Sequence, residues 1–152
     1  MCFSLCWLCY IEQYSLHINC GGKQTTIGNI KYEGDEDPGG AAKFVHNDKA
    51  NWGFSSTGDF WDVLSTQDDY IAKNVSILRM NNSELYTTAR LSPLSLTYYA
   101  RCLANGNYTV TLRFAEIVLR DNISYFGVGR RMFDVYIQVI ISLPSVFMPS
   151  YR

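Results

Sequence analysis

The amino-acid sequence predicts an all-β domain built as an antiparallel β-sandwich. Three observations predict this class: 14% of the residues are aromatic, several segments alternate apolar and polar side chains with a period of two, and no long segment has the 3.6-residue period of an amphipathic helix. The 152 residues, 47% of them hydrophobic, have the length and apolar content of a single folded domain.

The first predicted element is a strand over Tyr14–Cys20, which alternates by two and stops at the double glycine that follows. Lys31–Gly40 is dense in turn residues and predicts a polar loop. Trp52–Gly58 also has the composition of a loop. Strand signals resume near Tyr70 and continue over Asn74–Leu78.

The second half of the chain contains the clearest element. Leu96–Leu103 and Tyr108–Phe114 both alternate and flank an Asn-Gly pair, which predicts a β-hairpin with the even-numbered apolar residues of its second arm on one face. Met132–Ile137 predicts one more strand, and Ser83–Ala89 fits either a short helix or a strand.

Composition and motifs exclude several classes of function. With 13 basic and 14 acidic side chains, a net charge of −1 argues against a protein that neutralises nucleic-acid phosphates. No nucleophile, kinase or phosphate-loop motif occurs, so no catalytic residue and no cofactor are predicted. Asp35–Asp37 does not continue as a calcium loop and predicts a solvated acidic turn. The cysteines lack the paired spacing of a zinc site, so no metal is predicted.

Aromatic side chains are the candidate binding residues, because flat rings pack against the C–H faces of sugars while neighbouring polar groups bind hydroxyls. The alternative for each ring is a place in the core, since large aromatic residues are usually buried. The residues predicted to bind a ligand are Tyr32, Trp52, Tyr98 and Tyr99.

Four Asn-x-Ser/Thr sequons favour secretion and predict exposed glycosylation sites at Asn74, Asn81, Asn107 and Asn122. The segment Met1–Ile11 is apolar but has no preceding basic residue and no small-residue cleavage site, so a secretion signal is not evident. The uncharged segment Val135–Ser150 contains two prolines and is too short to span a bilayer.

Taken in order, several segments resemble the malectin domain found in the extracellular region of plant leucine-rich-repeat receptor-like serine/threonine kinases. These are Tyr14–Gly22, Trp52–Gly58, Leu85–Tyr99, Asn105–Val110, Phe114–Ile117 and Gly129–Gln138. The resemblance implies a malectin-like β-sandwich of the jelly-roll type, placed on the extracellular side of the plasma membrane, whose relatives carry a separate kinase domain.

The resemblance also sets expected boundaries. Residues 1–13 are unmatched, residues 14–138 form a partial malectin domain, and residues 139–152 are a tail that does not look like the family, so the fold is expected to be incomplete at its C-terminus. Loss of covering strands predicts exposed apolar sheet surface and a chain of poor solubility. The membrane would be reached only through parts that this chain does not contain.

Ligand residues carry over from the family only loosely. The resemblance extends to animal malectin, a lectin for glucosylated glycans. The positions of its sugar-binding aromatic residues fall on Leu91, Val118 and Leu119 here, and of that set only Trp52 keeps an aromatic ring. The partners that the resemblance implies are a cell-wall carbohydrate or a co-receptor ectodomain, and the alternative is a structural spacer that binds no sugar. Cysteines of the resembling domains fall on Cys9 and Cys20, which implies a disulfide between them and leaves Cys102 as a buried free thiol.

Overall fold

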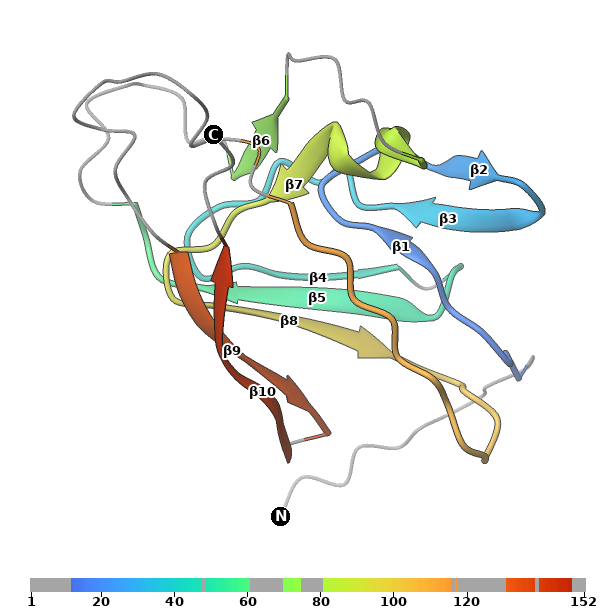
Figure 1. Ribbon diagram of the computed structural model, residues 1–152. Helices are drawn as coiled ribbons and strands as arrows, with labels where there is room; N and C mark the ends of the chain where they lie inside the picture. The colour runs from blue at the N-terminus through green and yellow to red at the C-terminus, as the bar shows by residue number, and fades with distance from the viewer. Residues whose placement is uncertain are drawn as a thin grey trace.

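The computed structural model describes residues 12–47, 49–60, 70–74, 81–115, 117, 131–138 and 140–148. In these ranges the protein is all-β, with one 3₁₀ turn, η1, and no α-helix. The elements are β1 Ile18–Asn19, β2 Thr25–Ile27, β3 Ile30–Gly34, β4 Phe44–Asn47, β5 Trp52–Thr57, β6 Ile71–Lys73, η1 Ser83–Tyr86, β7 Thr88–Arg90, β8 Ser95–Ala100, β9 Arg131–Ile137 and β10 Ile140–Met148. Figure 1 shows the sheet β4-β5-β8 across the middle of the molecule, with β1, β2 and β3 above it.

The central sheet is antiparallel in the order β4-β5-β8, and its middle strand is the segment that the sequence predicted to be a loop. That prediction was wrong for Trp52–Thr57. Phe54 pairs with Val45 on one side and with Tyr98 on the other, so β5 is hydrogen-bonded along both edges. Trp52, Phe54 and Ser56 alternate onto one buried face, which is the period-two pattern of a strand.

A second sheet has the order β1-β3-β2. β2 and β3 form a hairpin through the two-residue turn between Ile27 and Ile30, so the predicted loop over Lys31–Gly40 is wrong in its first part, which is strand to Gly34. The strand predicted at Tyr14–Cys20 is reduced to Ile18–Asn19 and runs parallel to β3, unlike the remaining ladders of the described structure.

Ser83–Ala89, for which helix and strand were both open, contains both. η1 occupies Ser83–Tyr86, and β7 begins at Thr88. β7 pairs with β6, which confirms the strand signal near Tyr70 up to Lys73; residues 75–78 lie outside the described residues. This pairing sets Arg90 opposite Ile71 and directs it toward the core.

The hairpin predicted around Asn105-Gly106 is wrong. Its first arm exists as β8, but Tyr108–Phe114 forms no strand. The chain leaves the sheet at Cys102, whose φ is 58°, and the backbone of Gln13 takes the position beside Leu103 through hydrogen bonds to Cys102 and Ala104. In the described structure Leu103 is therefore bridged to Gln13 and not to a second arm of a hairpin.

β9 confirms the strand predicted at Met132–Ile137, and β10 follows it as an antiparallel partner after a turn at Gln138. The register of this hairpin shifts between Ile141 and Leu143 and again between Leu143 and Val146. Pro144 lies between the second pair and has no N–H to donate to a ladder, so the shift is expected there.

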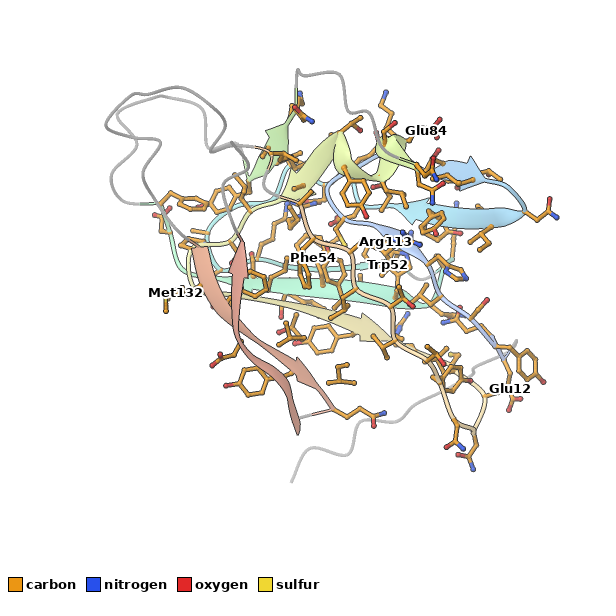
Figure 2. The ribbon with its side chains drawn as sticks, in the orientation of Figure 1. Glu12, Trp52, Phe54, Glu84, Arg113 and Met132 are labelled. Atoms are coloured by element: carbon orange, nitrogen blue, oxygen red, sulfur yellow. The ribbon has the colours of Figure 1, made fainter. Side chains whose placement is uncertain are left out.

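Few apolar side chains of the described residues are buried: Trp52, Phe54, Tyr70, Ala72 and Ile117. In contrast, the even-numbered residues from Tyr108 to Phe114 are each 41–51% exposed, and Figure 2 shows Met132 projecting away from the other strands. The expected exposed apolar surface is thus present. The described residues include no helix long and apolar enough to cross a bilayer.

Candidate functional site

The four aromatic residues predicted to bind a ligand lie in three different places. Trp52 and Tyr98 face inward from the central sheet, and Figure 2 shows Trp52 and Phe54 on the same side of β5. Trp52 is only 3% exposed, and Tyr98 is half-buried between Trp52 and Phe54 with ring centroids 6.2 and 5.9 Å away. A ring buried to this extent packs the core, so the alternative interpretation holds for Trp52.

Tyr98 belongs to a buried polar cluster centred on Asp35, which is 2% exposed. The Arg90 guanidinium donates from Nη2 to Asp35 Oδ1 at 2.6 Å and from Nε to Oδ2 at 3.0 Å, and the Tyr98 hydroxyl donates to Oδ2 at 2.6 Å. The Gly21 amide approaches Oδ2 at 3.3 Å. The expected solvated turn at Asp35–Asp37 is therefore wrong for Asp35, which is the most extensively hydrogen-bonded carboxylate of the described residues.

Burial and charge act together on the groups around Asp35. Burial alone lowers the pKa of Arg90, but hydrogen bonds and the charge of Asp35 outweigh it and the net pKa is raised. The pKa of Tyr98 is raised, chiefly by burial and further by its electrostatic interactions with Cys20 and Asp35. The arginine stays charged and the phenol stays protonated, so the cluster is an ion pair with a neutral donor and not an acid–base pair.

The cysteines do not pair as the resemblance implied. Cys20 is free, and Cys102 is disulfide-bonded, so the Cys9–Cys20 disulfide is not formed and Cys102 is not the free thiol. Cys9 lies outside the described residues. The residue Cys20 has exposed surface, yet its thiol is desolvated beside Tyr98, which raises the pKa of the thiol. The thiol is desolvated because Cys20 directly follows β1 and lies at the edge of the Asp35 cluster.

Tyr32 lies at a different surface, on the face of the β2–β3 hairpin that is turned toward η1. Its cross-strand partner Thr25 donates a hydrogen bond to Glu84 of η1 at 3.2 Å. The exposed Arg113 completes this surface: hydrogen bonding to Tyr86 raises the pKa of Arg113, and Tyr32 adds to the rise. Two phenols, a guanidinium and a carboxylate are thus gathered at one place, which we call the Tyr32 site.

A cleft of about 510 Å³ adjoins the Tyr32 site, and His17 connects the two. His17 lines the cleft and its ring meets that of Tyr32 at 5.4 Å between centroids. Lys31 and Glu33, which flank Tyr32 in β3 and form a 2.8 Å ion pair, point into the cleft from the opposite face of the strand. The other lining residues are Gln13, Ser15, Leu16, Asn29, Ile30, Lys49, Ala50 and Asn51.

The chemistry of this region is that of polar recognition. The cleft and the Tyr32 site offer hydrogen-bond donors and acceptors of both charges beside ring faces and the apolar side chains of Leu16 and Ile30. Within the described ranges, no three His, Cys, Asp or Glu side chains are placed to hold a metal ion.

The sequence named Tyr32 as a candidate binding residue and did not point to Tyr86, Arg113 or His17. Arg113 had one usable signal, since the alternation of Tyr108–Phe114 set it on the polar face of that segment. Nothing in the sequence indicates that residue 113 meets residue 32. Tyr99, the fourth predicted ring, lies on the outer face of the central sheet and is 44% exposed.

The sequons differ in their exposure. Asn81 and Asn107 are exposed, as expected for glycan acceptors. The predicted exposure of Asn74 is wrong for its side-chain nitrogen. Asn74 follows β6, and its Nδ2, the atom to which a glycan is attached, has less than 1 Å² exposed. Asn122 lies outside the described residues.

The family model of the malectin domain matches residues 14–145, which covers most of the chain. The chain belongs to the malectin domain family. The match begins at Tyr14 and continues to residue 145, seven residues beyond the end that the sequence predicted at Gln138.

Relatives of this malectin domain are receptor kinases. It is 47% identical over 130 residues to the probable LRR receptor-like serine/threonine-protein kinase At1g07650 of Arabidopsis thaliana and 48% identical over 128 residues to RFK1 of the same plant. These alignments cover 82% and 81% of this chain but only 13% and 12% of the relatives, so the chain spans about an eighth of their length. No solved structure matches the chain.

Proposed function

We propose that this malectin domain is an extracellular, non-catalytic recognition module of a plant receptor kinase, and that it binds a carbohydrate. Its malectin family and receptor-kinase relatives support a receptor module. The ligand would be a cell-wall carbohydrate, bound at the Tyr32 site and the adjoining cleft. We further infer that the small sheets belong to the two layers of an antiparallel β-sandwich of the jelly-roll type.

The single observation that carries the carbohydrate proposal is the grouping of Tyr32, Tyr86 and Arg113 beside a cleft of about 510 Å³. Rings supply apolar faces for sugar C–H groups, while a guanidinium donates two hydrogen bonds in one plane. Turn residues form part of the cleft, beside strand β3, and turns are where a β-scaffold usually carries its binding residues.

Binding of the 152-residue chain to an array of plant cell-wall oligosaccharides tests this proposal. Arg113→Ala removes the guanidinium from an exposed position, and Tyr32→Phe removes one hydroxyl while keeping the ring. Each variant is expected to weaken binding about tenfold, the effect of losing about 1.4 kcal/mol of interaction. Lys73→Ala, which removes an exposed cation from β6, is the matched control and should bind as the parent does.

The spacer hypothesis makes the opposite prediction. A module that only separates other domains, or contacts a co-receptor ectodomain, leaves the whole array unbound. Binding that is equally strong in the Arg113→Ala and Lys73→Ala variants would place the ligand elsewhere on the domain and overturn the Tyr32 site.

A further inference from the structure

The outer face of the central sheet carries a second group of exposed rings, separate from the Tyr32 site. Strand alternation and register place eight residues on this face, opposite the buried Trp52 and Phe54. They are Phe44 and His46 of β4, Gly53, Ser55 and Thr57 of β5, and Ser95, Thr97 and Tyr99 of β8.

Three of these side chains form a connected aromatic surface. Phe44 is 65% exposed and lies nearly parallel to His46, with centroids 6.1 Å apart and planes at 22°. The same ring meets Tyr99 edge-on, with centroids 6.2 Å apart and planes at 65°. Phe44 and Tyr99 are thus exposed rings in contact with each other, and neighbouring exposed rings form a candidate contact surface.

Gly53 allows β5 to pack closely against β4 beneath the rings. It pairs with His46 on one side and Tyr99 on the other, so it occupies the position between two ring-bearing residues. A Cβ at Gly53 would lie 2.8 Å from the Val45 carbonyl oxygen, so no other residue fits without a shift of backbone. Gly53 therefore lets the backbones of β4 and β5 lie close together beneath the rings, and the rings of Phe44, His46 and Tyr99 stay in contact above it.

Hydroxyl groups continue the same face without any charge. Ser55 Oγ and the Tyr99 hydroxyl are 2.9 Å apart, and Thr57 Oγ1 and Ser95 Oγ are 2.6 Å apart. Each pair uses one of its two protons, so the other hydroxyl keeps a proton to donate to a ligand. None of the eight residues is Asp, Glu, Lys or Arg.

We propose that this outer face binds a chain of neutral polysaccharide, with sugar faces on Phe44 and Tyr99 and sugar hydroxyls on the Ser and Thr row. The lack of cations argues against nucleic acid and anionic membranes, both of which are bound through Lys and Arg. From Gly53 to Thr57 the strand extends roughly 13 Å, enough for more than one sugar ring. This inference rests on the proposed function for its class of ligand, and it assigns that ligand to a second surface.

Sedimentation of the 152-residue chain with microcrystalline cellulose, an insoluble neutral glucan, tests the inference. The parent is expected to sediment with the polymer, and the bound fraction should not change between low and high salt, because a neutral ligand offers no charge to screen. Phe44→Ala/Tyr99→Ala should lower the affinity tenfold or more. Tyr136→Ala, which removes a ring of 58% exposure from β9, is the matched control and should bind as the parent does.

Phe44→Leu distinguishes stacking from folding, because it keeps an apolar side chain at an exposed position and removes only the flat ring. Loss of sedimentation with an unchanged unfolding midpoint supports the inference. A parent chain that does not sediment, or a double variant that sediments as well as the Tyr136→Ala control, overturns it. Arg113→Ala separates the two proposals: it should weaken array binding at the Tyr32 site about tenfold and leave cellulose binding intact.

Discussion

At the scale of single residues, the Asp35 carboxylate is the group on which most of the described interior depends. It accepts hydrogen bonds from Arg90, Tyr98 and Gly21, while the Arg90 guanidinium also lies 4.5 Å above the Phe54 ring. Because both charged side chains are 1% exposed, neither is solvated by water if the other is removed.

We therefore predict that Asp35→Ala destabilises the domain by about 3–5 kcal/mol, the usual effect of leaving one buried charge without its partner. Urea denaturation of the parent and the variant gives this difference. Glu36→Ala, which removes the exposed neighbouring carboxylate, should change stability by less than about 0.5 kcal/mol. Equal effects of the two substitutions would mean that the ion pair contributes nothing specific.

Cys20 gives a prediction about reactivity. Since desolvation raises the pKa of its thiol, a smaller fraction of it is thiolate at neutral pH than in an unperturbed cysteine. Iodoacetamide should therefore label Cys20 more slowly in the folded chain than in urea, despite the exposed surface of the residue. Peptide mapping without reductant should recover Cys20 alkylated and Cys102 within a disulfide. Faster labelling in the folded chain would contradict the raised pKa.

At the scale of elements, the loop between β3 and β4 is held by Asp37. Its Oδ1 accepts hydrogen bonds from Lys43 Nζ at 2.6 Å and from the Gly39 amide at 2.8 Å. Burial on its own raises the pKa of Asp37, but these donors and the positive charge of Lys43 outweigh it, so the net pKa lies below 3.8.

A carboxylate whose pKa is lowered by folding stabilises the folded state when the pH is above the pKa of the unfolded state. This stabilisation is lost as the pH falls through the pKa of the folded state. The contribution of Asp37 should thus be complete above its ordinary pKa of 3.8 and disappear below it. Lys43→Met should raise the pKa of Asp37, as read from an NMR titration of its carboxyl carbon. Its stability difference from the parent should shrink as the pH falls below that value. An unchanged titration would show that Lys43 does not hold the loop.

β5 illustrates how far the sequence predicts these elements. Its residues alternate, with two rings and Ser56 on one face and Gly53, Ser55 and Thr57 on the other. Glycine and hydroxyl residues also favour turns, and this local preference masked the pattern. What decided the outcome is non-local: hydrogen bonding to β4 and β8 satisfies both edges of β5, which local composition does not report.

The same limit applies to the candidate site. Alternation correctly predicted β9, whereas the choice of Tyr32 as a binding residue from the aromatic composition stays a prediction. Which residues surround Tyr32 depends on pairing between distant segments, since Tyr86 and Arg113 come from η1 and from the irregular stretch after β8. Periodicity assigns a residue to one face of a strand, but it does not show which distant segment packs against that face.

At the scale of the whole molecule, apolar side chains remain in contact with water. The alternating residues Tyr108, Val110, Leu112 and Phe114 are among those exposed, although Phe114 contacts Phe133 of β9 at 5.1 Å between centroids. We predict that the isolated chain binds a hydrophobic dye such as ANS under native conditions. Val110→Thr/Leu112→Thr should reduce dye fluorescence without lowering the unfolding midpoint. Unchanged fluorescence would show that this row is not the exposed surface.

The exposure of the sequon asparagines can be tested by their glycosylation. In a secreting host we predict that Asn81→Gln and Asn107→Gln each remove one glycan, because both side chains are exposed. Asn74→Gln should change the mass of the glycoprotein only by the added methylene group, since the Nδ2 of Asn74 is buried. Intact mass spectrometry measures these differences. A glycan at Asn74 would show that this site is modified before β6 and β7 pair.

The partners of Asp35 also determine when the domain is able to fold. Gly21, Arg90 and Tyr98 lie 14, 55 and 63 positions from Asp35 along the chain. The hydrogen bonds of the carboxylate therefore form only after three loops have closed, and two of these loops are long. Contacts so distant along a chain form late and slow the approach to the native state. During synthesis, Tyr98 must emerge from the ribosome before the Asp35–Arg90 ion pair can be buried with all its partners. Until then the nascent chain exposes both Phe54 and an unpaired Asp35, and we expect this interval to be the time at which it most needs a chaperone.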